Sequence, residues 1–151
     1  MKNIIRIALF IILGTVGLAL PVRSADLEIH CIDVGQGSSE LIIGPNGTTI
    51  LIDGGTGSKG RDEVVPYLNA IFPVGSRQLD YIIASHDDGD HYGGLLSVMD
   101  EGYTAGTIYH CGDNTDFGEG VQIPIEAEID LGDGARALCV GTYGEYIDGS
   151  T

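Results

Sequence analysis

The order of apolar and polar residues predicts short strands followed by an alternation of helices and strands. Strands are expected where apolar residues alternate or run together between turn residues, at 27–34, 40–43, 48–52, 79–85, 107–111, 125–131 and 135–140. A helix is expected from a cap at Asp62 to residue 72, and another over 93–99, whereas the Gly- and Ser-rich segment 54–60 reads as a loop. This order of elements indicates an α/β protein.

The first 24 residues have the layout of a secretory signal peptide. Lys2 and Arg6 precede an apolar run at 7–20, and small residues follow around a cleavage point after Ser24 or Ala25. A membrane anchor is the alternative, although the run is short for a span. We therefore expect residues 1–24 to be removed, residues 25–151 to form one domain, and the protein to be exported to the periplasm or outside the cell, with no membrane attachment.

Net charge narrows the choice of partners. Cleavage after Ser24 would leave four basic residues against 22 acidic ones, a formal charge of −18. Because a surface this acidic repels polyanions at long range, we expect no tight binding of nucleic acid. Phosphodiester chemistry at a metal site stays open, because bound cations invert the local field.

The number of cysteines limits the disulfides that an exported chain of this sequence could form. Cys31, Cys111 and Cys139 are an odd number, so at most one internal disulfide can form. None stands in a Cys-x-x-Cys arrangement, and we expect all three to act as small buried apolar residues.

Ionisable side chains are most concentrated at residues 86–91, directly after an apolar run. Buried imidazoles and carboxylates are costly unless they are paired, and a metal ion resolves that cost. His86 and Asp88 can reach one side of the loop, and Asp90 and His91 follow at an expected helix start, which suits a two-metal centre. A solvated acidic loop at a helix N-terminus is one alternative. A calcium loop is another, although the Asp-x-Asp-x-Asp-Gly register is absent.

Three motifs carry a family resemblance. The pattern His-x-Asp-x-Asp-His-x-Gly-Gly at 86–94 follows Ile-Asp-Val-Gly-Gln-Gly at 32–37 and Ile-Leu-Ile-Asp-Gly-Gly at 50–55. Together they resemble the metallo-β-lactamase superfamily. Asp88 stands where the usual motif has a second His, which resembles the metallohydrolase domain of competence (DNA-internalisation) channel proteins in particular.

The resemblance implies a role for each motif residue. His86 and Asp88 would hold a first metal ion and Asp90 and His91 a second, while Asp90 would also orient or deprotonate the attacking water. Asp53 would support the site from beside the metals. Two Zn²⁺ ions are expected, with Mn²⁺ as the alternative because the carboxylate of Asp88 makes the site harder.

The family fold is an αβ/βα sandwich, and the motifs match its N-terminal half. The second half supplies further ligands that these 151 residues do not show, so we expect a domain incomplete at its C-terminus. The function expected is that of an exported metal-dependent hydrolase, whose metal-activated water attacks an ester or phosphodiester, in a small molecule or a longer chain. The alternative is a truncated, non-catalytic half-domain that binds metal. An acidic extracellular calcium-binding or adhesion module is a third possibility, and the sequence indicates neither substrate nor oligomeric state.

Overall fold

The structure is a computed structural model that describes residues 25–111, 120–142 and 145–146, so the expected signal peptide lies outside the described residues. Its strands are β1 (Glu28–Cys31), β2 (Glu40–Ile43), β3 (Thr49–Ile52), β4 (Gln78–Ala84), β5 (Thr104–His110), β6 (Val121–Gln122), β7 (Glu128–Gly132), β8 (Ala135–Leu138), β9 (Gly141–Thr142) and β10 (Glu145–Tyr146). Its helical segments are α1 (Gly57–Lys59), a π-helical turn (Gly60–Val64), α2 (Val65–Ile71) and α3 (Tyr92–Asp100). No helix in these ranges is long and apolar enough to cross a membrane.

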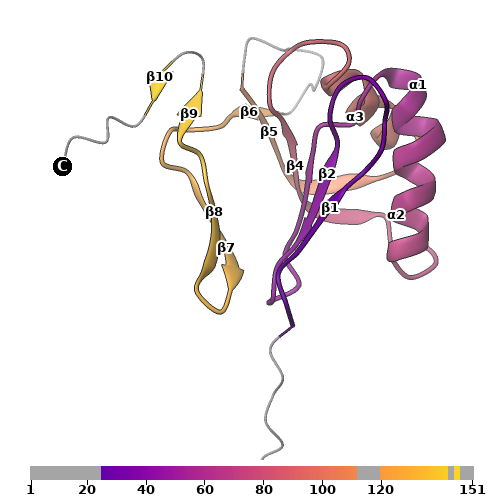
Figure 1. Cartoon of the computed structure of the whole chain (residues 1–151). Coiled ribbons are helices and arrows are strands. Elements are labelled where there is room, and N and C mark those ends of the chain that lie inside the picture. Colours follow the sequence, from indigo (N-terminus) through magenta and orange to yellow (C-terminus); the bar gives the residue numbers. More distant parts are fainter. Residues whose placement is uncertain (1–24, 112–119, 143–144, 147–151) are drawn as a thin grey trace, which may run out of the picture.

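A six-stranded sheet in the order β1-β2-β3-β4-β5-β6 forms the centre of the molecule (Figure 1). Strands β1 to β3 are antiparallel, whereas β3 to β6 run parallel. Helical segments connect β3 to β4 and β4 to β5, as parallel neighbours require. The carboxyl ends of β3 and β4 therefore meet at one edge of the sheet, where residues 53 and 85–91 follow them.

One face of the sheet is covered by the helices. Leu51 of β3 and Ile82 of β4 point to this face and are fully buried against Leu68 of α2 and Leu95 of α3. Burying each such side chain contributes about 2 kcal/mol, which makes this layer the main core of the described chain.

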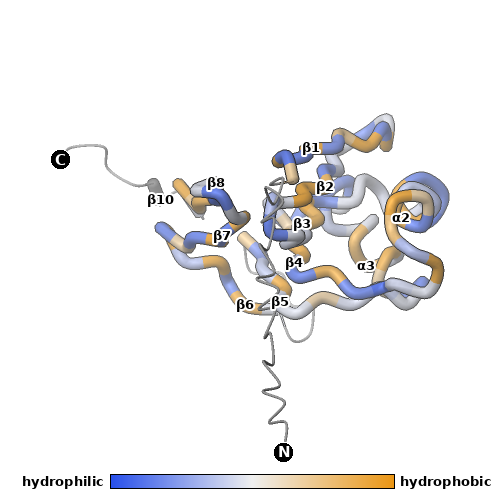
Figure 2. Tube along the Cα trace, turned by 90° about the horizontal axis from the view of Figure 1, so that it is seen from below, coloured by the Kyte–Doolittle hydropathy of each residue, from blue (hydrophilic) through white to orange (hydrophobic). Residues whose placement is uncertain are grey.

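The opposite face is covered by the β7–β8 hairpin. Ile129 and Leu131 of β7 pack against Ile50 and Ile83 of the sheet. The tube view shows the three layers in order, hairpin, sheet and helices, with apolar segments concentrated between them (Figure 2). The backbone N–H of Asn46 donates to the carbonyl of Leu131 at 3.0 Å, which ties the hairpin to the β2–β3 turn.

The α/β class and most predicted elements are confirmed, and β2 has the expected bounds. The loop expected at 54–60 is wrong, because α1 and the π-helical turn begin there. Gly60 allows this turn by packing directly on the backbone of Gly94 in α3, a contact that local sequence does not reveal. Asp62 is not a cap; its carboxylate pairs with Arg61 at 2.9 Å.

The cysteines also differ from the prediction. Cys31 is exposed on the edge strand β1, while Cys111 and Cys139 are only half-buried. Cys31 is exposed because the hairpin covers the middle of the sheet and leaves the β1 edge open.

Candidate metal centre

Asp53 is the buried anchor of the site, at the end of β3. Its backbone adopts φ 56°, a left-handed conformation that is uncommon for a residue other than glycine. Its carboxylate accepts hydrogen bonds from the Ser85 N–H at 2.8 Å, the Ser85 hydroxyl at 2.6 Å and His91 Nδ1 at 2.8 Å. These three bonds satisfy a carboxylate that is 2% exposed and hold the strained backbone in place.

His91 is positioned by close backbone packing between α3 and the loop after β3. The Gly54 N–H donates to the His91 carbonyl at 2.8 Å, and the Gly94 N–H donates to the Gly55 carbonyl at 2.8 Å. A Cβ on Gly94 would overlap the backbone of Gly54, and one on Gly54 would overlap Gly94. Gly54 and Gly94 thus let the start of α3 approach the end of β3 closely enough for the His91 ring to reach Asp53.

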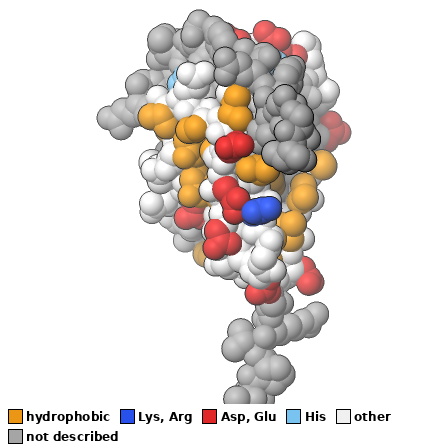
Figure 3. Space-filling view, turned by 90° about the vertical axis from the view of Figure 1, so that its left-hand side faces the viewer, with side chains coloured by type: hydrophobic (Ala, Val, Ile, Leu, Met, Phe, Trp, Pro, Cys, Tyr) orange, Lys and Arg blue, Asp and Glu red, His pale blue; other side chains and the backbone are white. Residues whose placement is uncertain are grey.

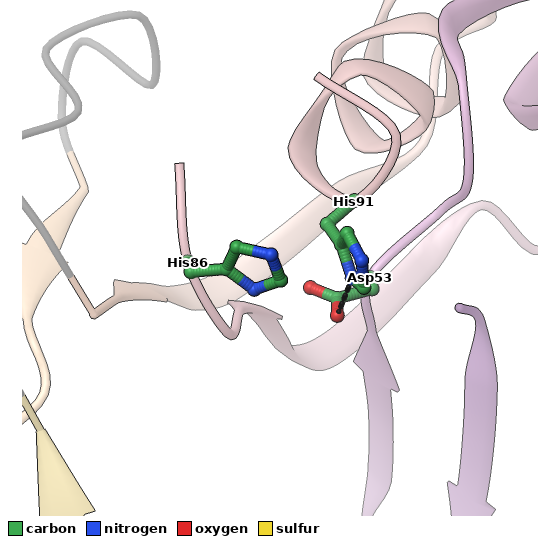
Figure 4. A group of neighbouring side chains, drawn as sticks. All are labelled: Asp53, His86 and His91. Carbon is green, nitrogen blue, oxygen red and sulfur yellow. Dashed lines mark hydrogen bonds and ion pairs between the residues drawn. The ribbon is translucent and has the colours of Figure 1, made fainter. Parts of the chain in front are cut away.

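His86 joins the same network through Ser85. The Ser85 hydroxyl lies 2.8 Å from His86 Nδ1, and the rings of His86 and His91 are 3.9 Å apart between centroids. Figure 4 shows His86, His91 and Asp53 converging from the loop after β4, the start of α3 and the end of β3.

The hydrogen bonds determine which imidazole nitrogens carry protons. A carboxylate only accepts, so His91 Nδ1 and the Ser85 hydroxyl both donate to Asp53. Because the Ser85 hydroxyl uses its one proton to donate to Asp53, its oxygen accepts a hydrogen bond from Nδ1 of His86. In the neutral form of each ring Nε2 therefore keeps its lone pair, which is the state needed to bind a metal ion.

Asp88 lies beside His86 on the exposed side of the loop. Its Oδ2 is 3.4 Å from His86 Nε2, and its side chain is 74% exposed. Two ligands at about 2.0 Å from one tetrahedral zinc ion are about 3.3 Å apart, so this pair has the spacing of two ligands of one ion. The same distance also fits a direct ion pair with a protonated His86.

Asp90 is held by Gln36 from the loop after β1. The Gln36 side-chain amide donates to Asp90 Oδ2 at 3.1 Å. This bond, aided by the backbone N–H of Asp90, lowers the pKa of Asp90 against the opposing effect of desolvation, and His91 and His86 lower it further when they are protonated. Asp90 is thus an ionised carboxylate next to the two histidines.

Asp53, His86 and His91 form a group whose ligand atoms all lie within 4.8 Å of one another. Asp88 contacts this group through His86. Asp90, whose side chain is held by Gln36, interacts electrostatically with both histidines. The donor set of two imidazoles and nearby carboxylates fits a divalent metal ion. That His86, Asp88, Asp90 and His91 are its ligands, and that Asp53 supports them, stays a prediction.

The sequence assigns no role to Ser85, and the family resemblance places Gln36 only in a loop that borders the site. Ser85 is a small polar residue at the end of an apolar strand, next to the first ligand, and that position was a signal. Gln36 belongs to the first motif, but its link to Asp90 spans 54 positions and depends on the fold.

Comparisons with known proteins identify the family to which the chain is similar. Residues 32–149 match the family model described as the metallo-β-lactamase superfamily. The chain is 36% identical over 103 residues to recombination protein 2 of Haemophilus influenzae, covering 64% of this chain and 12% of that protein. It is 39% identical over 80 residues to competence protein ComA of Neisseria gonorrhoeae, covering 53% and 11%. The chain thus spans about a tenth of the length of these relatives.

A solved structure shares the fold. The crystal structure of the metallo-β-lactamase SMB-1 bound to 2-mercaptoethanesulfonate matches with a TM-score of 0.53 and 22% identity, over 69% of this chain and 47% of that one. The resemblance to this fold and to competence proteins is confirmed. Since the family model covers most of the sequence, the chain belongs to the metallo-β-lactamase superfamily.

Proposed function

We propose that this chain carries the metal-binding site of an exported hydrolase that cleaves an ester, with a phosphodiester as the first substrate class to test. The observation that supports this most is the group Asp53, His86 and His91 at the carboxyl edge of the sheet. The relatives named for recombination and competence favour a phosphodiester over other esters.

Each residue has a distinct part in this proposal. His86 and His91 bind metal through Nε2, with Asp88 beside His86 as an oxygen ligand. Asp53 fixes both rings, directly at His91 and through Ser85 at His86. A bound divalent metal lowers the pKa of a coordinated water and so supplies a nucleophile near neutral pH.

Asp90 is the proposed proton acceptor and water-orienting group. The hydrogen bond from Gln36 lowers the pKa of Asp90 and keeps its carboxylate ionised, within electrostatic range of both histidines. A carboxylate in this position can take a proton from an attacking water and orient the oxygen of that water toward the substrate. Binding of a second metal ion by Asp90 and His91 is compatible with the same role.

Zinc is the first metal to test and manganese the second. Two imidazoles suit zinc, whereas the carboxylates of Asp88 and Asp90 suit harder ions such as Mn²⁺. Export, with residues 1–24 as a signal peptide, remains part of the proposal.

The test uses the full chain stripped of metal and reloaded with Zn²⁺ or Mn²⁺. We expect metal-dependent hydrolysis of bis(p-nitrophenyl) phosphate that a chelator abolishes and that His91→Ala reduces to background. Asp90→Asn should lower turnover by about 100-fold while the ion held by His86 and Asp88 still binds. Asp87→Asn is the matched control, because Asp87 is an exposed carboxylate of the same loop. Hydrolysis that survives both the chelator and His91→Ala would contradict the proposal.

A second candidate is metal binding without turnover. Within the described ranges one group of three residues qualifies as a metal site, whereas the expected centre has two ions. If metal binds with loss of affinity in His91→Ala but no ester is cleaved by the loaded chain, this second function is the correct one.

A further inference from the structure

Two of the three cysteines meet in an apolar cleft that the proposed metal chemistry does not use. The cleft has a volume of about 290 Å³ and lies between the β7–β8 hairpin and the sheet. Cys111, which directly follows β5, and Cys139, which directly follows β8, both line it. Both also pack against the same buried cluster, formed by Ile50, Ile83, Ile123, Ile129 and Leu131.

The thiols converge on strand β9. The Cys139 thiol donates to the Gly141 carbonyl at 3.5 Å. The Thr142 hydroxyl lies close enough to the Cys111 thiol to lower its pKa, although this buried hydroxyl makes no hydrogen bond of standard geometry within the described residues. Desolvation is the main cause that raises the pKa of Cys111, and the charge of Cys139 raises it further. The proximity of the two cysteines rests on the cleft and the apolar cluster that they share.

Cys31 is too far away to compete. It ends β1, whereas Cys111 follows β5, and the order of the sheet places four strand spacings between β1 and β5. At about 4.8 Å per spacing, the two cysteines are about 19 Å apart across the sheet. Disulfide-bonded residues have Cα atoms less than about 7 Å apart, so Cys31 cannot pair with Cys111. Cys139 lines the same cleft as Cys111, and Cys31 is not among the residues that line it.

We infer that Cys111 and Cys139 form a disulfide that joins the β7–β8 hairpin to the end of β5. The co-reactant is a low-molecular-weight disulfide such as oxidised glutathione. One protein thiolate attacks it and releases a first glutathione thiol, and the second protein thiol displaces the other. One sulfur–sulfur bond forms and one breaks, and the two protons leave on the two reduced glutathione molecules.

The link would stiffen the wall next to the metal centre. Ser85 lines the same cleft, and its hydroxyl carries the contact between His86 and Asp53. The cleft is therefore bordered by the hairpin on one side and by the support of the metal site on the other. This inference stands on the cysteine geometry alone and does not require that the chain be a hydrolase.

Tryptic mapping tests the pairing directly, because cleavage after Arg23, Lys59, Arg77 and Arg136 places each cysteine in a different peptide. The reduced, folded full chain is incubated with oxidised glutathione, alkylated and digested without reductant. Before alkylation we expect an intact mass lower by two hydrogen atoms, apart from any glutathione adduct at the exposed Cys31. The digest should show a cross-link between peptides 78–136 and 137–151, with alkylation or a glutathione adduct at Cys31 only. The same treatment in guanidinium should instead give a mixture of pairings.

Variants complete the test. Cys31→Ser should keep the cross-link, and Cys139→Ser should abolish it and leave Cys111 open to alkylation. Three alkylated cysteines, glutathione adducts without a cross-link, a cross-link that includes Cys31, or the same mixture in folded and denatured protein would each overturn the inference.

Discussion

The two faces of the central sheet are built in different ways. On the helix side, thirteen described residues form one buried cluster, and α3 meets the loop after β3 with its backbone. On the hairpin side, five buried residues hold the β7–β8 hairpin, and a cleft lined by Ile52, Ser85 and both inner cysteines remains. The space-filling view of the hairpin side shows apolar patches at the surface among acidic side chains (Figure 3).

The two faces of the sheet therefore contribute differently to the metal site. The helix side fixes the positions of Asp53 and His91, because any change in the packing of α3 on β3 moves one relative to the other. The hairpin side contributes little to that placement, and its looser cover leaves Ile29 and Val121 more than half exposed. We therefore expect changes on the helix side to affect folding and site geometry together, and changes on the hairpin side to be milder.

The strongest test compares two neighbouring residues of β3 that face opposite ways. Leu51 is fully buried under the helices, while Ile52 lines the cleft and is half-buried. We expect Leu51→Ala to lower the free energy of unfolding by about 3 kcal/mol and Ile52→Ala by about 1 kcal/mol, measured by urea denaturation. Equal losses would break the distinction between the faces.

A second comparison tests the backbone contact that positions His91. A Cβ on Gly94 would overlap Gly54, whereas a Cβ on Gly93 would make ordinary contact with Gly57. Gly94→Ala should lower the free energy of unfolding by about 2 kcal/mol through overpacking. Gly93→Ala, one position earlier in α3, should be neutral. A well-folded Gly94→Ala protein with unchanged stability would show that α3 and β3 can separate freely.

Asp53→Asn examines the support of the metal site with little change in shape. An amide nitrogen facing His91 would donate to Nδ1 and shift the ring proton to Nε2, where it blocks metal binding. We expect zinc affinity to fall by about 10- to 100-fold, measured by competition with a chromophoric chelator. Asp87→Asn, which removes an exposed charge nearby, is the control and should keep the affinity of the unmodified protein.

The smallest expected effect concerns thiol reactivity on the hairpin side. Burial raises the pKa of Cys111, so less of it is thiolate at pH 8, whereas Cys31 is exposed. In reduced, folded protein iodoacetamide should therefore modify Cys31 severalfold faster than Cys111, as followed by peptide mapping over time. Similar rates for both would mean that the cleft is open to solvent.

The sequence predicts the α/β class, most strands and the residues that gather at the site, because strand patterns and the three motifs are local. It does not predict the role of Ser85, which depends on the parallel register that pairs Ile52 with Ile83 and so sets Asp53 beside Ser85. The helical turn at Gly60 is likewise missed. Glycine favours a loop locally, and only the contact with Gly94 explains the helix.

The most direct test of the metal centre follows the four histidine rings by long-range ¹H–¹⁵N NMR during titration with zinc. We predict that Nε2 of His86 and of His91 shift as metal binds, with protons retained on both Nδ1 atoms. His30, whose ring contacts Tyr67 and Glu28, and His110 should keep their signals. Zinc-induced shifts at His30 or His110, or none at His86 and His91, would contradict the account.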